Sequence, residues 1–188
     1  MSSPWMWFAS RACGVVALVL LTVVVVLGVV AAIGVRPDTA VPTVTVGLHR
    51  IVGIGTVVFV LTHILLAVLD TYVNLGRLTM LVPFLAGYHR IWVGVGTVTF
   101  DLFVLVLVTS VLRLHMSHRT WRAVHWLSYA LAACAAVHGF MMSADDQPAF
   151  RIVTVVCAAV MGIAAGCRLC VRDPDRRRRA EIASGEWT

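Results

Sequence analysis

Five apolar runs dominate the sequence, and each is long enough to cross a lipid bilayer. Their approximate bounds are 13–35, 48–73, 88–112, 121–142 and 150–170. A hydrocarbon core about 30 Å thick needs roughly 20 apolar residues in a helix, and a spanning helix satisfies its own backbone hydrogen bonds. The runs therefore predict an all-α fold, a polytopic membrane bundle of about five transmembrane helices.

The composition agrees with a chain whose main solvent is lipid. Of the 188 residues 60% are hydrophobic and 13% charged, and the mean hydropathy is +0.93, well above ordinary soluble domains. Five spans leave room only for short connections, so we expect one membrane domain at 1–171 and an arginine-rich cytoplasmic tail at 172–188. The cysteines suggest no disulfide framework, and the single CxxC at Cys167 and Cys170 lacks the second ligand pair of a zinc site.

The arginines predict the topology. All 15 basic residues are arginine, and six of them lie in the last 21 residues. Cytoplasmic flanks of membrane helices collect Arg and Lys, so we expect the tail and the 36–47 and 113–122 loops inside. The N-terminus and the 74–87 and 143–149 loops are then outside the plasma membrane. Since the basic residues report topology, no nucleic-acid partner is expected.

Four histidines form two pairs of similar spacing within the apolar runs. His49 and His63 are 14 residues apart in the second run, and His125 and His138 are 13 apart in the fourth. Both separations correspond to roughly 20 Å along a helix. Because these two spans run parallel in the predicted topology, His49 should lie level with His125 near the inner face. His63 should lie level with His138 towards the outer face.

An ionisable side chain inside a span indicates a functional site. Neutral imidazole binds iron well, and two facing imidazoles make a six-coordinate haem typical of electron transfer. The four histidines therefore predict metal ligands for two b-type haems. On an ideal helix, residues 14 apart return to within roughly 40° of one face, whereas residues 13 apart miss it by roughly 140°. Helix tilt, local over- or underwinding, or ligands that reach around the helix could reconcile the fourth span.

Four arginines have positions suited to haem propionates, which guanidinium groups bind in a bidentate manner. Arg50 and Arg113 lie at the inner level, and Arg11 and Arg90 at the outer level. Ordinary interfacial arginines that reach towards lipid headgroups would have the same positions.

Two further classes of function compete with a cytochrome. In a haem-free membrane scaffold or assembly protein, the histidines would only form hydrogen bonds between helices. A transporter could use histidines and Asp101 for proton coupling, but it would call for paired broken helices in an internal repeat, which the sequence does not show. Gly53, Gly55 and Gly139 suit either close approach of a porphyrin or helix packing.

The sequence also resembles a known family over nearly its whole length. Two His pairs, H-x13-H and H-x12-H two spans later, are the spacing of ferric reductase and NADPH oxidase transmembrane domains, with the bacterial MsrQ proteins as relatives. The sequence segments around these pairs are also similar to those of the family: SRACG at 10–14, LHR at 48–50, YHRIWVGVGTVTFDL at 88–102, TSVLR at 109–113, WRAVHWLSY at 121–129 and VHGF at 137–140. Members commonly have six spans, so this chain looks like one that lacks the first.

The resemblance implies a membrane b-type cytochrome subunit that passes electrons through two bis-histidine haems. The acceptor would be on the outer side, such as ferric iron, oxygen or a periplasmic oxidoreductase. Relatives that use NADPH carry a flavin and nucleotide domain, whereas no G-x-G-x-x-G motif stands between a strand and a helix here. A separate flavoprotein or a quinol is therefore the expected electron donor. His89 resembles an outer histidine near the distal haem of the oxidases, and an interfacial histidine explains it equally well.

Overall fold

The computed structural model describes residues 5–33, 41–70, 75–143 and 147–170. The predicted tail at 172–188 lies outside these residues. The described elements, in chain order, are α1 (Trp5–Ile33), α2 (Val41–Leu69), η1 (Arg77–Met80), α3 (Arg90–Val111), η2 (Leu112–His115), α4 (His118–His125), α5 (Leu127–Met142) and α6 (Pro148–Cys170). The η elements are single 3-10 turns.

Five helical segments are long and apolar enough to cross a membrane, with α3 and η2 forming one and α4 and α5 another. The predicted all-α bundle of five spans is confirmed. The predicted bounds of the first two spans were wrong by several residues. Helix α1 begins at Trp5 rather than near residue 13, and α2 covers Val41–Leu69 rather than 48–73. A helix can continue beyond the hydrocarbon layer, and the proline at position 42 is tolerated because the first-turn N–H groups have no helical partner.

The fourth span is not the single uninterrupted helix that the apolar run predicted. It breaks at Trp126, directly after His125, between α4 and α5. Around the break, the N–H of Trp126 bonds to the carbonyl of Arg122, and the N–H of Tyr129 bonds to the carbonyl of Trp126 at 3.2 Å. This second bond spans three residues, which winds the chain more tightly than an α-helix. The helical phase therefore changes between His125 and His138, and the ideal-helix angle does not apply.

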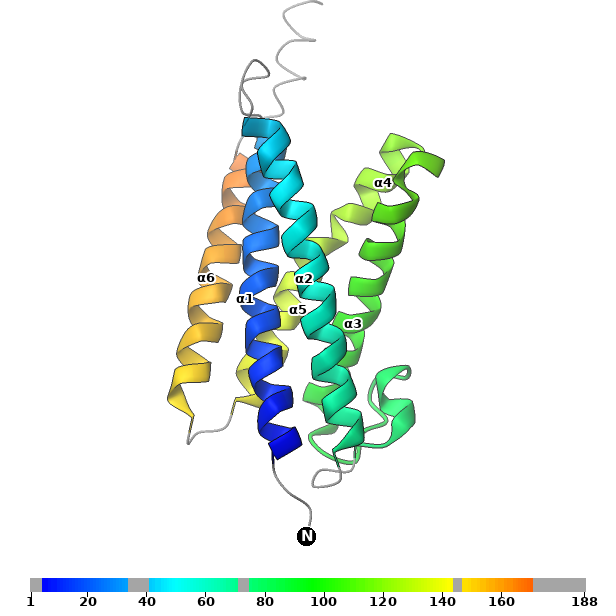
Figure 1. The fold of residues 1–188 in the computed structure, drawn as a ribbon, viewed down its shortest axis with the longest axis vertical. Helices are drawn as coiled ribbons and strands as arrows, with labels where there is room; N and C mark the ends of the chain where they lie inside the picture. Colours follow the sequence, from blue (N-terminus) through cyan, green and yellow to red (C-terminus); the bar gives the residue numbers. More distant parts are fainter. Residues whose placement is uncertain (1–4, 34–40, 71–74, 144–146, 171–188) are drawn as a thin grey trace, which may run out of the picture.

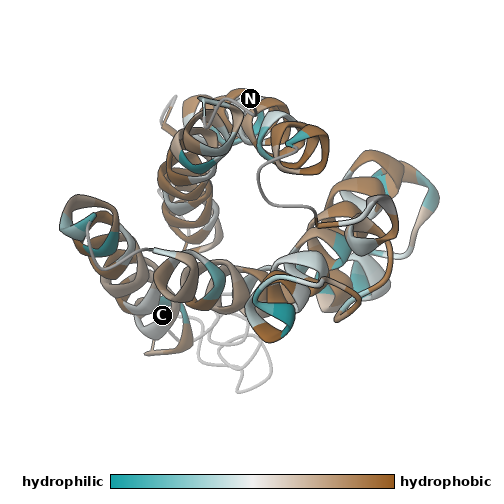
Figure 2. Cartoon of the chain, turned by 90° about the horizontal axis from the view of Figure 1, so that it is seen from below, coloured by the Kyte–Doolittle hydropathy of each residue, from teal (hydrophilic) through white to brown (hydrophobic). Residues whose placement is uncertain are grey.

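The packed core lies on one side of α1. Buried side chains from α1, α5 and α6 interdigitate there: Leu18, Leu21, Val25, Leu131, Ala132, Cys157 and Met161. On its other side α1 packs along the length of α2, while α3 packs against α5. Contacts between α2 and the α3–α5 half are sparse. Seen from one end, the helices are arranged in an arc, and most of their residues are apolar (Figure 2).

The upper end of the bundle carries a group of arginines. Figure 1 shows the start of α2, the α4 segment and the end of α6 at the top, and the N-terminus at the bottom. Arg113 in η2, Arg119 and Arg122 in α4, and Arg168 in the last turn of α6 thus belong to the upper end. Arg168 and the arginines of the 113–122 loop, which the sequence placed on one side of the membrane, share one end of the described part of the molecule.

Candidate functional site

Two histidine pairs face each other across the space between α2 and the α4–α5 segment. The ring centres of His49 and His125 are 6.5 Å apart, and those of His63 and His138 are 6.3 Å apart. We call His49 and His125 the upper pair, and His63 and His138 the lower pair, because His49 is nearer the start of α2 and His125 ends α4, which Figure 1 draws towards the top. The structure therefore brings together the same partners that the parallel-span prediction joined.

These separations fit a metal ion held between two imidazoles. Rings that bind one metal from opposite sides through Nε2 have centres about 6.3 Å apart, since each metal–nitrogen bond is about 2.0 Å and each ring centre lies about 1.15 Å behind its nitrogen. Within the described residues no group of three or more His, Cys, Asp or Glu side chains could hold a metal ion. Each pair offers two imidazole nitrogens as possible metal ligands.

Three of the four histidines are oriented by hydrogen bonds to a neighbouring helix. His49 Nδ1 donates to the carbonyl of Val24 at 3.0 Å, and His63 Nδ1 to that of Ser10 at 2.7 Å. His138 Nδ1 donates to the carbonyl of Trp92 at 2.8 Å. Since a carbonyl only accepts, Nδ1 holds the proton in all three rings. Nε2 then keeps its lone pair, as metal-binding histidines require.

His63 has an additional contact with α1. The hydroxyl of Ser10 donates to the backbone carbonyl of His63 at 2.9 Å and lies 3.2 Å from its Nδ1. Ser10 is 1% exposed. Because Ser10 O accepts from the ring while Ser10 Oγ donates to the backbone of the same residue, His63 is held from two sides.

His125 is the exception. Its Nδ1 is buried and finds no hydrogen-bond partner within the described residues. The ring instead stacks on Trp121, with ring centres 5.0 Å apart and planes 23° from parallel. The guanidinium of Arg113 covers the same tryptophan at 4.6 Å. His125 is therefore positioned by stacking rather than by a carbonyl.

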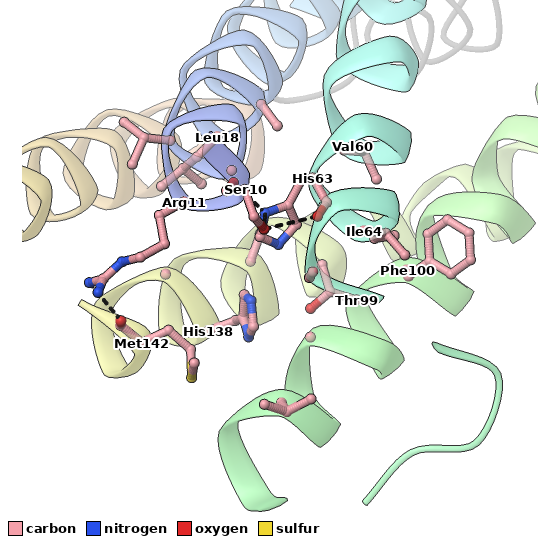
Figure 3. Close-up of a pocket in the computed structure, with 18 of the residues that line it drawn as sticks. Ser10, Arg11, Leu18, Val60, His63, Ile64, Thr99, Phe100, His138 and Met142 are labelled. Carbon is pink, nitrogen blue, oxygen red and sulfur yellow. Dashed lines mark hydrogen bonds between the residues drawn. The ribbon is translucent and has the colours of Figure 1, made fainter. Parts of the chain in front are cut away.

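A cavity surrounds the lower pair. It lies between α1, α2, α3 and α5, and its lining is mostly apolar, with Leu18, Val60, Ile64 and Phe100 among the side chains labelled in Figure 3. Figure 3 shows the rings of His63 and His138 turned towards each other across this space. The cavity is thus an apolar space with imidazoles on two opposite walls.

Of the four predicted arginines, Arg11 has the clearest place in the site. It lines the cavity of the lower pair and donates from Nη2 to the carbonyl of Met142 at 3.1 Å. Its guanidinium also lies 5.9 Å from the ring centres of both Trp7 and Phe150. Arg11 therefore holds a positive charge at the lower end of an apolar cavity.

The other three arginines lie outside that cavity. Arg113 reaches the upper pair through Trp121, and Arg50 is exposed beside His49. Arg90 is exposed, and its Nε donates to the carbonyl of Phe84. His89 is the N-cap residue of α3, has a left-handed backbone conformation with φ of 39°, and contacts Tyr88 edge-on. It is not part of the cavity lining either.

The sequence interpretation missed three glycines that lie against the rings of the pair histidines. A Cβ on Gly14 would lie 2.9 Å from the ring of His63, and one on Gly96 2.6 Å from that of His138. Gly28 would place a Cβ 3.3 Å from the ring of His49. One signal was present in the sequence: Gly14 and Gly28 are 14 residues apart, the spacing of the two histidines on α2.

The glycines singled out from the sequence have other surroundings. A Cβ on Gly53 would meet nothing within 4 Å, and one on Gly55 would meet only Leu20 at 3.7 Å. Gly139 lines the cavity, but its space is filled by Thr154 and Leu18 in ordinary contact. Helix packing accounts for Gly139.

Comparison with known proteins gives a match to one protein family. No curated protein and no solved structure matches the chain. The family model described as "Ferric reductase like transmembrane component" matches residues 13–137. The matched segment is more than half of the chain, includes His49, His63 and His125, and ends one residue before His138. On this match, and with five membrane-crossing segments around paired histidines, the chain belongs to the family of ferric reductase-like transmembrane components.

Proposed function

We propose that this protein is a membrane b-type cytochrome subunit that carries electrons across the bilayer through two bis-histidine haems. The observation that carries the proposal is the facing of two imidazoles at two depths, with ring centres 6.5 and 6.3 Å apart. Family membership points to membrane electron transfer, and domains of this family generally bind haem. The haem type and the number of haems are our inference from the two pairs.

The histidines fit haem better than a bare metal ion. A porphyrin supplies four nitrogen ligands, so the protein needs to add only the two axial ones. Bound at each pair, haem would supply an iron centre that gains and loses one electron. The four pair histidines would hold the group through Nε2, and the Nδ1 bonds of His49, His63 and His138 would fix three of the rings. The apolar walls of the lower cavity exclude water, which lowers the local dielectric around the centre.

Arg11 and Arg113 are the residues we propose for propionate recognition. Arg11 holds its charge at the lower cavity, and Arg113 lies over the tryptophan that stacks on His125. A guanidinium fork pairs well with a carboxylate. Arg50 and Arg90 stay weaker candidates, because neither lines the lower cavity nor lies over the tryptophan that stacks on His125.

We infer the direction of electron flow from the membrane orientation, which the arginines at the upper end indicate. Positive-inside bias favours a cytoplasmic upper end, where Arg113, Arg119, Arg122 and Arg168 gather. In this proposal the chain sits in the plasma membrane with its N-terminus outside and C-terminus cytoplasmic. The electron donor would be a separate flavoprotein or a quinol on the cytoplasmic side, next to the upper pair. The acceptor, such as ferric iron, oxygen or a periplasmic oxidoreductase, would be on the outer side, next to the lower pair.

A visible spectrum of the detergent-purified protein tests the cofactor. Bis-histidine haem b gives sharp reduced α and Soret bands, and pyridine haemochrome analysis should find close to two haems per polypeptide. A ratio near one would remove one pair from the proposal. Reporter fusions test the orientation separately: a C-terminal reporter active outside the cell would exchange the inner and outer assignments.

One observation favours a second candidate, a haem-free scaffold or assembly protein. The Nδ1 bonds of His49, His63 and His138 join helices, as histidines do when they only hold a bundle together. A scaffold does not need Nε2 of facing rings to be free, yet within the described residues no hydrogen bond reaches Nε2 of these three. The spectrum decides, because the scaffold has no haem bands.

A further inference from the structure

Each histidine that bonds to a carbonyl does so beside a glycine at one fixed offset. Gly14, Gly28 and Gly96 lie four residues after Ser10, Val24 and Trp92, whose carbonyls accept from His63, His49 and His138 respectively. The same four-residue relation therefore occurs three times, on two different helices. A helix-packing glycine has no reason to repeat this offset.

Helix geometry explains the offset. In an α-helix the carbonyl of one residue already accepts from the N–H four residues later. The side chain of that later residue leans towards the helix N-terminus and covers the preceding turn. With glycine at that position, the carbonyl stays open to a second donor from another helix. The imidazole can then lie against the backbone itself.

The space at the three glycines is closely fitted to the rings. A Cβ at Gly96 would lie 2.6 Å from the His138 ring, and one at Gly14 2.9 Å from the His63 ring. At Gly28 the corresponding distance to the His49 ring is 3.3 Å, so the ring there would need to shift only slightly. In contrast, a Cβ at Gly53 or Gly162 would meet nothing within 4 Å.

We propose that Gly14, Gly28 and Gly96 are positioning residues for the axial ligands, each opening a carbonyl that fixes one imidazole in its metal-binding tautomer. The proposal rests on the proposed function for the metal, but the hydrogen bonds themselves do not depend on it. Gly14 and Gly96 serve the two ligands of the lower pair. Gly28 serves one ligand of the upper pair.

Alanine at each glycine tests this, with Gly162→Ala and Gly166→Ala on α6 as controls, since a Cβ at either position would meet nothing within 4 Å. Haem bound per chain is measured with the two spectral components resolved, beside helicity by circular dichroism. Gly96→Ala should lose most of the lower pair's component, and Gly14→Ala at least half of it, while the upper component and the helicity remain. Gly28→Ala should keep its haem and shift only the upper component. The controls should match the unmodified protein.

The pattern of loss decides the outcome. Equal loss of both components in all three variants, or a full complement of both haems in all three, would overturn the proposal. Where Gly96→Ala reduces helicity, the double variant Gly96→Ala/His138→Gly with added free imidazole replaces it. A ligand that is not tethered can avoid the new Cβ, so haem recovery should equal that of His138→Gly alone, and a smaller recovery would contradict positioning.

A haem-independent measurement separates this proposal from the function. If the unmodified protein binds no haem, the proposed function fails, but the effect of the glycines on the histidine tautomers can still be measured. ¹⁵N NMR of histidine-labelled apoprotein should show three pair histidines as the Nδ1–H tautomer, with Gly96→Ala changing the His138 signal. If the tautomer populations of the three histidines were unchanged by all three substitutions, the positioning role would be refuted.

Discussion

The two histidine pairs lie in the same bundle and differ in how their rings are supported. In the lower pair both rings donate from Nδ1 to a carbonyl, of Ser10 for His63 and of Trp92 for His138. In the upper pair only His49 does so, to Val24, and His125 Nδ1 has no partner among the described residues. Two similar pairs of ligands thus have unequal hydrogen-bond support, which matters because such partners set ligand orientation and basicity.

The difference has a local cause on α3. This helix runs antiparallel to α5, so the level 13 residues beyond Trp92 and Gly96 is that of Leu105 and Thr109. No glycine stands there. The hydroxyl of Thr109 donates to the carbonyl of Leu105 at 2.7 Å, and that of Ser110 donates to the next carbonyl, Val106, at 2.6 Å. Both carbonyls at this level of α3 therefore already accept a side-chain hydroxyl, which leaves them less open to a donor from another helix.

The largest expected effect comes from removing a ligand. His63→Ala and His138→Ala should each remove the same lower haem and leave the upper one, while His49→Ala and His125→Ala do the reverse. Haem per chain should fall from two to one in every case, since each iron loses one axial bond. His115→Ala, at an exposed position in η2, is the control and should keep both.

Loss of the lower component on changing His125 alone would break the pairing of ligands by depth. If all four single variants kept full haem, the hydrogen-bonding scaffold would become the better interpretation.

The unequal support of the two pairs predicts unequal retention of haem. Loss of a hydrogen-bond partner behind a metal ligand typically costs about 10–100-fold in metal affinity, so the upper haem should leave about tenfold faster. Transfer to excess apomyoglobin measures this, with His49→Ala reporting the lower haem alone and His63→Ala the upper haem alone. Equal rates, or faster loss from the lower site, would show that stacking on Trp121 holds His125 as well as a carbonyl would.

A smaller effect is expected in the reduction potentials. Donation from Nδ1 to a carbonyl makes imidazole a stronger electron donor, which favours ferric iron and lowers the potential. With two such bonds at the lower pair and one at the upper, the upper haem should be more positive by about 60 mV, a tenfold change for one electron. A redox titration followed at the α bands measures the gap, and the opposite order would contradict the hydrogen-bond explanation.

The smallest effect is the most specific to the comparison. Thr109→Gly removes both the cover and the hydroxyl from the carbonyl of Leu105, which would give His125 the support that its three counterparts have. The upper potential should move a few tens of millivolts towards the lower one, well under the ~60 mV of a tenfold change. Glycine inside a helix costs about 1 kcal/mol, so thermal unfolding is followed in parallel. An unchanged upper potential in a folded variant would mean that the Thr109 side chain is not what keeps His125 from a carbonyl. The relative position of α3 and His125 would then be the cause.

Much of this molecule is predictable from the amino-acid sequence alone. Five apolar runs determine the all-α bundle, because a bilayer sets the length and the composition of each span. Their alternation in direction makes the second and fourth spans parallel. Depth then follows from residue count, so His49 meets His125 and His63 meets His138. Each of these steps uses only the length, the order and the residue count of the spans.

The support of each ligand was decided only by the tertiary structure. The break at Trp126 reset the helical phase between His125 and His138, which no apolar run records. Which carbonyl faces a given imidazole depends on how α1 and α3 lie against α2 and α5. The periodicity of the histidines' own helices contains no information on that register. The glycine offset becomes meaningful only once two helices are in contact, because it describes an opening on one backbone that a ring from another must reach.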